Sequence, residues 1–257
     1  MKLVTFNING IRARMPRLLE YLAREQPDIV CLQELKCADD VLPVGDIEAA
    51  GYRAVWHGQK GFNGVAILSR GEAPALRQIG LPGDPDDSHS RYIEAQVSGL
   101  IVASIYLPNG NPIGTDKFTY KLRWMERLAS RAAELLAEER PVVLAGDFNV
   151  IPEDRDTFST RAMANDALLQ PESQAAFRSL VYQGWADALR IIHPTEPRLF
   201  TFWDYQAGAL ARDAGFRIDH LLLSPGAADR LRGAGVDKWA RAEEKASDHA
   251  PTWVELA

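Results

Sequence analysis

Acidic and amide side chains recur at the ends of short apolar segments of this 257-residue chain. Asn7 and Asn9 follow the run KLVTF, and Glu34 follows DIVCL. Burying such groups without partners in a core costs free energy, so their repeated placement needs a chemical reason. The same pattern recurs four more times, with Tyr106 and Asn109 after LIVASI, Asp147 and Asn149 after VVLAG, Asp219 and His220 before LLLS, and Asp248 and His249 before APTWVEL.

The chemistry of this set is that of a metal site made of oxygen atoms. Carboxylate and amide oxygens are hard ligands that suit Mg²⁺ or Mn²⁺ better than zinc. No Cys or His group has zinc-ligand spacing, and no nucleotide-binding glycine motif or GxSxG elbow is present. A divalent metal, acidic groups and a catalytic histidine together suit hydrolysis of a phosphate ester by an activated water. The oxygen donors are Asn7, Glu34, Asp147, Asn149 and Asp248.

The elements that must position these residues are short strands alternating with helices, which predicts a layered α/β fold. Several strands are apolar at consecutive positions, so we expect both faces of the sheets to be covered. Apolar residues at helical spacing predict helices over 117–137, 15–24 and 174–182. The segment 71–90 is expected to be a long excursion, and residues 1–257 one domain. If the strands that begin at Asp219 and after His249 run opposite to the others, all six polar clusters meet at one rim.

Charge and cysteine content limit the function further. The net charge of −6 argues against a protein that coats nucleic acid non-specifically. Two local clusters could still contact phosphates, one with Arg12, Arg14 and Arg17 and the other with Arg53, Lys60 and Arg70. No segment has the roughly 20 apolar residues of a membrane helix, and the N-terminus lacks the pattern of a signal peptide. Cys31 and Cys37 lack CxxC spacing, which indicates reduced thiols. We therefore expect a soluble cytoplasmic protein, associated with the nucleoid and monomeric.

At these residues the sequence resembles the exonuclease III family of abasic-site endonucleases, within the endonuclease/exonuclease/phosphatase superfamily. GDFN, the QE pair at a strand end and SDH are shared across that superfamily. The segments FNINGIRAR, YLPNGN and the pair FWDY and GFRID are narrower and resemble the DNA-repair branch. The resemblance covers almost the whole chain, and its matching segments are TFNINGIRAR (5–14), DIVCLQELK (28–36), GVAILSR (64–70), RYIEA (91–95), YLPNG (106–110), LAGDFNV (144–150), TFWDY (201–205), GFRIDHLLLS (215–224) and SDHAP (247–251).

The resemblance implies a four-layered α/β sandwich of the deoxyribonuclease I type, with two mixed β-sheets packed together and helices outside. It implies a Mg²⁺- or Mn²⁺-dependent enzyme that cleaves duplex DNA 5′ to abasic sites and acts as a 3′→5′ exodeoxyribonuclease and 3′-phosphodiesterase. Its partners would be double-stranded DNA with abasic sites or 3′ ends. The metal ligands so implied are Asn7, Glu34, Asp147, Asn149, Asp248 and His249.

The same resemblance assigns roles in catalysis. Asp147 would orient and deprotonate the attacking water, and Asn149 would hold that water or the phosphoryl oxygen. His249 would contact the scissile phosphate, with Asp219 fixing its tautomer, and Tyr106 would donate to the phosphate or the leaving oxygen. The DNA-binding residues would be Asn109 and Arg91 at the cleft wall and Trp203 in the pocket for the baseless sugar, with Lys60 and Arg12 added on grounds of charge.

One departure from the family pattern concerns Asp213, where relatives often carry Asn. A carboxylate there would repel phosphate, so a role in lining the pocket is in doubt, although Arg212 could compensate. Two other functions stay open from the residues alone. One is a superfamily phosphatase acting on a small phosphate ester, and the other is a catalytically silent module that binds DNA ends.

Overall fold

Two six-stranded mixed sheets form the centre of the computed structural model, which describes residues 1–257. The first sheet has the order β11-β12-β1-β2-β4-β3, with β1 Lys2–Asn7, β2 Ile29–Gln33, β3 Tyr52–His57, β4 Val65–Arg70, β11 Leu231–Val236 and β12 Thr252–Leu256. The second sheet has the order β5-β6-β7-β8-β10-β9, with β5 Ala75–Ile79, β6 Tyr92–Val97, β7 Leu100–Tyr106, β8 Val142–Asp147, β9 Ala186–Asp187 and β10 Asp219–Leu223.

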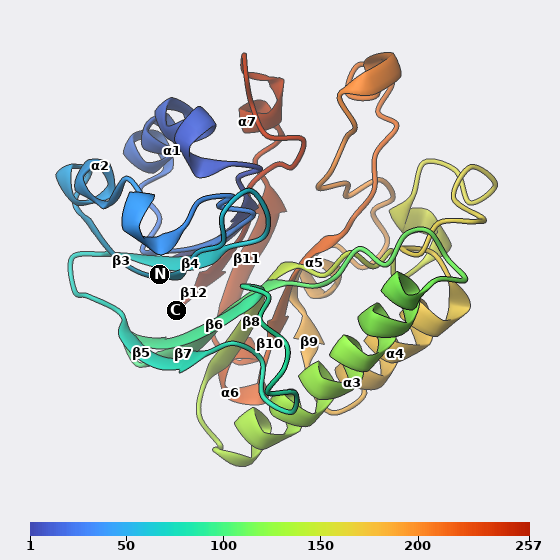
Figure 1. The fold of residues 1–257 in the computed structure, drawn as a ribbon, viewed down its shortest axis with the longest axis horizontal. Helices are drawn as coiled ribbons and strands as arrows, with labels where there is room; N and C mark the ends of the chain where they lie inside the picture. Colours follow the sequence, from blue (N-terminus) through green and yellow to red (C-terminus); the bar gives the residue numbers. More distant parts are fainter.

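The two sheets pack face to face over a shared apolar core (Figure 1). Successive side chains of a strand point to opposite faces, so Leu3 enters this shared core while Val4 packs on the outer side of the same sheet. Cys31 of the first sheet and Val143 of the second also belong to the shared core. Both faces are buried, which explains the consecutive apolar positions in these strands and confirms that expectation.

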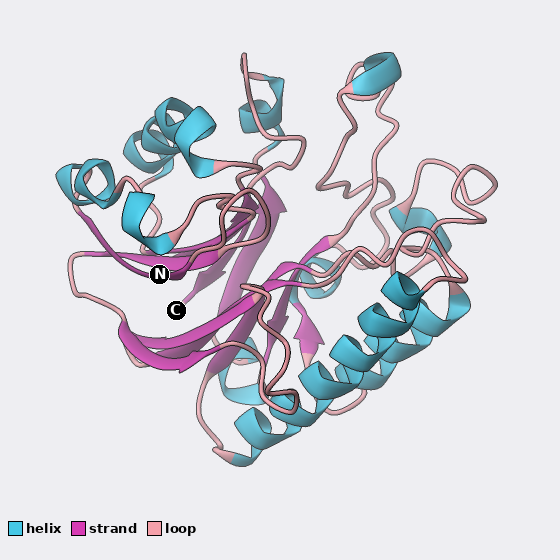
Figure 2. Ribbon diagram, viewed as in Figure 1, coloured by secondary structure: helices cyan, strands magenta, loops and turns pink.

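Helices cover the two outer faces, and this completes four layers (Figure 2). Met15 of α1 packs in a cluster with the first sheet, and Trp124 of α3 and Phe177 of α4 pack in a cluster with the second. The predicted α/β sandwich is thus confirmed. The helices are α1 Ile11–Glu25, α2 Val44–Ala49, α3 Asp116–Ala137, α4 Pro171–Val181, α5 Ala188–Ile192, α6 Pro225–Ala228 and α7 Lys238–Ala242, with 3₁₀ turns η1 Asp39–Val41, η2 Asp154–Asp156 and η3 Gln206–Gly208.

The three helices predicted from apolar spacing are all present. Helix α3 begins at Asp116, one residue before its predicted start. Helix α1 begins at Ile11, four residues early, and continues through Pro16. Helix α4 begins at Pro171, where the fixed φ of proline suits the first turn. None of the helices is long and apolar enough to cross a membrane.

The prediction of an irregular excursion over residues 71–90 is partly wrong, because β5 lies within it. β5 is the edge strand of its sheet, and Leu76 and Ile79 are exposed. An edge strand with little buried surface has no apolar run from which to predict it. The neighbouring β6 buries Glu94, which is paired with Arg77 and Arg131, so its sequence also looks less apolar than its position.

Strand direction brings the polar clusters to one rim, as the sequence pattern required. β10 runs antiparallel to β8, with Asp219 opposite Asp147, and β12 runs antiparallel to β1. β7 runs parallel to β8 and places Tyr106 beside Asp147. The backbones of β7 and β8 approach closely, since a Cβ on Gly146 would lie 2.0 Å from the carbonyl oxygen of Ile105.

Candidate active site

Asp147, Asp219 and His249 form the centre of the rim. His249 Nδ1 lies 2.8 Å from Asp219 Oδ2, and His249 Nε2 lies 3.8 Å from Asp147 Oδ2. One ligand atom from each residue lies within 4.8 Å of the others, and all three residues are buried. Asp219 Oδ1 is buried without a hydrogen-bond partner. Two carboxylates so close together repel each other, which favours a proton on the imidazole or a bound cation between them.

Glu34 lies beside this centre and is held by residues from two other segments and by Lys36 of its own turn. Asn7 Nδ2 donates to Glu34 Oε1 at 2.9 Å and to Asp147 Oδ2 at 3.0 Å, so it bridges the two carboxylates. The hydroxyl of Tyr106 donates to Glu34 Oε1 at 2.9 Å. Lys36 Nζ lies 2.7 Å from the other oxygen, Oε2. The structure thus brings both sheets together at Glu34.

The backbone at Glu34, Lys36 and Asn149 lies in the left-handed region, with φ of 54°, 52° and 48°. Asparagine adopts this region readily, but glutamate and lysine do so rarely, and such strain persists only where the surroundings hold it. The turn after each strand directs the side chain back over the rim, so local backbone strain is part of how the site is built.

Lys36 and Asn9 connect Glu34 with Asp248. Lys36 Nζ donates to Asn9 Oδ1 at 2.6 Å, and Asn9 Nδ2 donates to Asp248 Oδ1 at 2.9 Å. Sequence reasoning missed Lys36. Its position two residues after Glu34, in the same turn, is a signal that could have found it.

A second missed residue is Lys121, which lies under the Asn149 side of the site. It is fully buried, and Nζ donates to the carbonyl oxygens of Asn149 at 2.6 Å, Asn109 at 3.0 Å and Ala167 at 3.4 Å. Burial lowers the pKa of Lys121 to about 7. Lys121 lies on the buried apolar face of α3 together with Met125. A lysine at an apolar position of a predicted helix is the sequence signal that could have identified it.

The charges at the centre favour a cationic histidine. Burial alone would lower the pKa of His249, but Asp219, Asp147 and Asp248 together raise it to about 10. Burial raises the pKa of Asp147 to about 7, against the opposing effect of His249. A histidine that binds a metal must be neutral. These charges and the contact with Asp219 suit His249 as a phosphate contact, and its role as a metal ligand stays a prediction.

The oxygen donors at the rim match the needs of a divalent cation. Glu34, Asp147 and Asp248 offer carboxylate oxygens, the donors that Mg²⁺ and Mn²⁺ prefer. Although burial acts to raise it, the pKa of Glu34 is lowered by Asn7, Lys36 and His249, so this carboxylate is ionised. These residues fit a divalent ion.

The two asparagines in the predicted ligand set have their amide oxygens engaged. Asn7 Oδ1 accepts from the backbone N–H of Asn9 at 3.0 Å, and Asn149 Oδ1 accepts from Asn109 Nδ2 at 3.1 Å. In this arrangement Asn7 presents its amide nitrogen to the carboxylates. Each amide oxygen keeps a second lone pair, so Asn7 and Asn149 stay predicted ligands, and both also position their neighbours here.

The predicted DNA-binding residues divide into two groups. Asn109 and Arg91 line one cavity beside the site, and Lys60 and Arg12 line another together with Lys36. The loop of residues 58–64 contributes to both cavities. Four of the five predicted residues therefore lie at the surface on either side of this loop.

Trp203 is the exception and corrects the prediction. Its ring is only 1% exposed and packs with Phe200 and Ala250. Its indole N–H donates to Asp213 Oδ1 at 3.1 Å. Trp203 is therefore a core residue that offers no surface to DNA, because the chain around it closes into a small apolar cluster.

The charge of Asp213 is balanced within the protein. Lys238 Nζ lies 2.5 Å from Asp213 Oδ1, and the pKa of this carboxyl is lowered by Lys238 and Trp203 despite the opposing effect of burial. The predicted compensation by Arg212 is wrong, because its side chain donates to the carbonyl of Ala207. Lys238 is the main compensating cation, with Arg198 3.9 Å from the other carboxylate oxygen.

Comparison with known proteins places the chain in a family. Residues 4–249 match the Endonuclease/Exonuclease/phosphatase family. The chain is 34% identical over 267 residues to the exodeoxyribonuclease III of Haemophilus influenzae, with 100% of each chain covered. It is 37% identical to an AP endonuclease from Archaeoglobus fulgidus, with a TM-score of 0.95 over 100% of this chain and 99% of that one. It is also 37% identical to a Neisseria 3′ phosphatase whose structure holds a product DNA hairpin. The TM-score is 0.96, over 100% of this chain and 99% of that one.

The fold and the rim of acidic residues define a phosphoesterase, and the chain belongs to the Endonuclease/Exonuclease/phosphatase family. Its full-length similarity to exodeoxyribonuclease III makes it a DNA-repair nuclease. This family is dependent on divalent metals.

Proposed function

We propose that the chain hydrolyses phosphodiester bonds of duplex DNA, cutting 5′ to abasic sites and removing nucleotides and blocking groups from 3′ ends. The observation that carries this proposal is the buried Asp219–His249 pair beside Asp147 and Glu34. A cation and a base on the two sides of one phosphate suit in-line attack by water. The relatives named above act as an exodeoxyribonuclease, an AP endonuclease and a 3′ phosphatase, which supports all three activities.

The metal would be Mg²⁺ or Mn²⁺, held by Glu34 and Asp248 with Asp147 close by. When bound, a divalent ion supplies positive charge that polarises the phosphoryl group and stabilises the charge that develops on it. The amide oxygens of Asn7 and Asn149 each accept one hydrogen bond and keep a second lone pair, so both are proposed as further ligands beside Glu34 and Asp248.

Each remaining side chain has a proposed task at a stated atom. Asp147 accepts the proton of the attacking water, and its pKa of about 7 suits a base at neutral pH. His249 donates from Nε2 to a phosphate oxygen, while Asp219 holds Nδ1 and favours the imidazolium. Tyr106 donates from its hydroxyl to the phosphate or leaving oxygen, and Asn149 orients the water or a phosphoryl oxygen.

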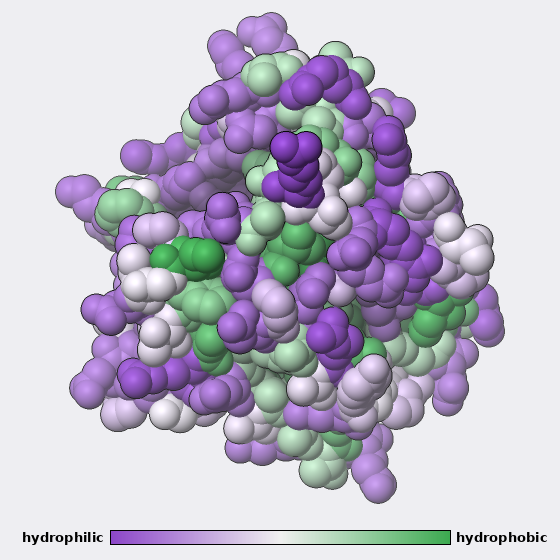
Figure 3. Space-filling model, turned by 90° about the vertical axis from the view of Figure 1, so that its right-hand side faces the viewer, coloured by the Kyte–Doolittle hydropathy of each residue, from purple (hydrophilic) through white to green (hydrophobic).

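DNA would lie across the rim, with Arg12, Lys60, Arg91 and Asn109 as contacts to its backbone. The face seen in Figure 3 is mostly hydrophilic, with separate small hydrophobic patches, which suits a polar substrate better than a large protein interface. We propose that the chain acts as a single catalytic domain and as a monomer. Its two free cysteines are consistent with a reducing compartment, so we propose a cytoplasmic site of action at the nucleoid.

A duplex with one abasic-site analogue, incubated with Mg²⁺, tests the proposal. The expected product is a single nick 5′ to the analogue, absent with EDTA and lost in Glu34→Ala. Glu244→Ala is the matched control, because that side chain is 88% exposed and lies outside the site. No nick with the wild type, or an undiminished nick with Glu34→Ala, would refute the proposal.

Parallel substrates distinguish the finer activities and the alternative function. A 3′-phosphate duplex and a plain blunt duplex measure the phosphatase and exonuclease activities beside the incision. A panel of small phosphate esters tests the phosphatase alternative, which predicts turnover of these esters in preference to DNA. Turnover of DNA under excess substrate would eliminate a silent DNA-binding module.

A further inference from the structure

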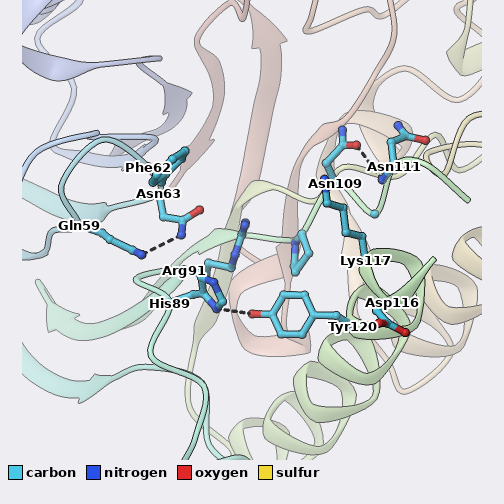
Figure 4. A pocket seen from close by; sticks show the side chains of 12 residues that line it. Gln59, Phe62, Asn63, His89, Arg91, Asn109, Asn111, Asp116, Lys117 and Tyr120 are labelled. Carbon is cyan, nitrogen blue, oxygen red and sulfur yellow. Dashed lines mark hydrogen bonds between the residues drawn. The ribbon is translucent and has the colours of Figure 1, made fainter.

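A cavity of about 620 Å³ adjoins the active site and is not needed for the chemical step. One wall is the loop between β3 and β4, which carries Phe62, and the other is the segment from Asn109 to Tyr120 at the start of α3 (Figure 4). Its size lies in the range of pockets that hold one small-molecule ligand. Two of the twelve lining residues are hydrophobic and the others carry polar groups, so the cavity suits a ligand with both ring surface and polar groups.

Two cations of this cavity have no acidic partner. Arg91 lies with its guanidinium 4.7 Å from the centre of the Tyr106 ring, and its only hydrogen bond is to the carbonyl of Tyr106 at 3.2 Å. Its Nε atom is buried without a partner. Lys117 is exposed and forms no ion pair. By contrast Arg127, outside the cavity, pairs with Asp87 at 2.8 Å. Asp116 also lines the cavity, but it forms no ion pair with either cation. Two cations and one carboxylate leave an excess of positive charge, which favours an anionic ligand.

His89 lines the same cavity and is held by the carboxylate of Asp87. His89 Nδ1 lies 2.9 Å from Asp87 Oδ1, and the hydroxyl of Tyr120 donates to the same carboxylate at 3.0 Å. A carboxylate only accepts, so Nδ1 carries the hydrogen and Nε2 has no protein partner. His89 is 46% exposed while Asp87 is 4% exposed. The ring is therefore held from behind with one edge available to a ligand.

Aromatic surface completes the cavity. Phe62 is 71% exposed at its lip, and the Tyr120 and His89 rings lie 5.5 Å apart at an angle of 50°. Exposure of a phenylalanine ring to water costs free energy, and a ligand that covers the ring removes this cost. Planar bases stack on such rings without sequence preference. Phosphate-binding cations and a ring surface in one cavity together match a nucleotide.

We propose that this cavity is a subsite for one unpaired nucleotide that flanks the scissile phosphate; this inference rests on the proposed nuclease function. Arg91 contacts Tyr106, which contacts Glu34, and Asn109 contacts Asn149, so the cavity adjoins the active site at two points. A neighbouring nucleotide of the same strand reaches it when its base pair opens. The base stacks near Phe62, and its phosphate lies between Arg91 and Lys117.

Binding without cleavage gives the direct test. Two duplexes carry 2-aminopurine as the 5′ or the 3′ neighbour of an abasic-site analogue, and each is mixed with the full chain in EDTA. The fluorescence of 2-aminopurine falls when it stacks, so one of the two probes should change on binding to the wild type. Phe62→Ala should abolish that change while the duplex still binds. If neither probe responds to the wild type, the inference is wrong.

Kinetics with matched controls provide the second test. Phe62→Ala and Lys117→Ala should each raise KM about fivefold or more for a duplex with a mismatched flanking pair, with kcat little changed. Tyr182→Ala and Arg232→Ala are the controls, since Tyr182 is 82% exposed, Arg232 is exposed, and both lie outside the cavity lining. Equal effects in variants and controls would overturn the subsite.

The failure of this inference is distinguishable from failure of the proposed function. A wild-type chain that cleaves no DNA overturns the function itself. A chain that nicks the abasic duplex normally, but whose KM is unaffected by Phe62→Ala and Lys117→Ala, overturns only the subsite. If Lys117→Ala changes only the turnover of small phosphate esters, the cavity binds free phosphate. That result would overturn the proposal of a nucleotide subsite.

Discussion

His249 holds its Nδ1 atom 2.8 Å from Oδ2 of Asp219, and both side chains are buried. The second oxygen of Asp219 has no partner, so this carboxylate is committed to the histidine alone. The pairing fixes the tautomer, keeps the ring cationic and directs Nε2 toward the side of Asp147. We expect Asp219 to act through His249.

Asp219→Asn should lower kcat for abasic-site incision by about 10²–10⁴-fold. The amide would donate to Nδ1, so the ring would lose the proton there and with it the positive charge. DNA affinity should change little, because the cleft keeps its shape. Single-turnover cleavage and binding of the same duplex in EDTA measure the two quantities. A variant that retains wild-type kcat would show that the pairing is only structural.

Divalent metal should stabilise the folded chain. A ligand that binds only the native state raises the melting temperature, here by several degrees with excess Mg²⁺, because it offsets repulsion between Glu34 and Asp147. Scanning calorimetry with Mg²⁺ and with EDTA measures the difference. Glu34→Gln should remove most of it, and Glu244→Gln should leave it intact. An equal Mg²⁺ effect in Glu34→Gln would place the metal elsewhere.

Lys121→Met should destabilise the protein, because three buried carbonyl oxygens would lose their charged donor. Leaving one such buried group unsatisfied costs about 1–3 kcal/mol. We therefore expect the free energy of unfolding, measured with urea, to fall by about 3 kcal/mol in total. Lys117→Met, one turn earlier on α3 and exposed, is the control and should stay within about 0.5 kcal/mol. Matching free energies of unfolding for the two variants would contradict this account.

Stability should fall as the pH is lowered from about 6.5 to about 4, partly because of His220. Burial, followed by the charge of Arg217, lowers the pKa of His220 from 6.5 to about 4, with Asp187 and Asp156 opposing. The unfolded state binds the proton first in this window, so protonation favours unfolding, by an amount on the order of 3 kcal/mol. Below about pH 4 both states are protonated and this contribution is fully lost.

His220→Gln isolates that effect. Glutamine can accept from Arg217, which lies 3.1 Å from His220 Nδ1, and can donate to the carbonyl of Val150, but it does not titrate. Urea unfolding at pH 4.5 and pH 7 should show a smaller loss of stability for the variant than for the wild type. Carboxylates such as Asp156 make the same contribution to the pH dependence of stability in both proteins, so their effect cancels in the comparison. Identical pH slopes would remove His220 as a cause.

Lys60→Ala and Arg12→Ala should each weaken DNA binding and flatten its salt dependence. Each cation that contacts a phosphate contributes close to one unit to the slope of log K against log salt concentration. Titrations of an abasic duplex at several salt concentrations in EDTA provide the measurement, with Arg232→Ala as the exposed control. An unchanged slope would place Lys60 or Arg12 away from the DNA path.

The sequence determined the layers, the main helices and the polar rim, because these depend on local periodicity. Apolar residues on one side of α3 and apolar runs in β1 and β8 required buried faces whatever their partners. Polar residues at strand ends required a shared rim once the strand directions were known. The residues Glu34, Asp147, Asp219 and His249 could be chosen on this basis.

Only the tertiary structure decided which of these side chains are in contact and which protonation state each one adopts. The contact of Asn7 with Asp147 joins residues 140 apart, and that of Tyr106 with Glu34 joins residues 72 apart. The burial of Trp203 and the burial of Lys121 under Asn149 also depend on distant segments. Local pattern cannot encode such contacts, because burial, pKa and hydrogen-bond choice arise from neighbours that only the packed sheets bring together.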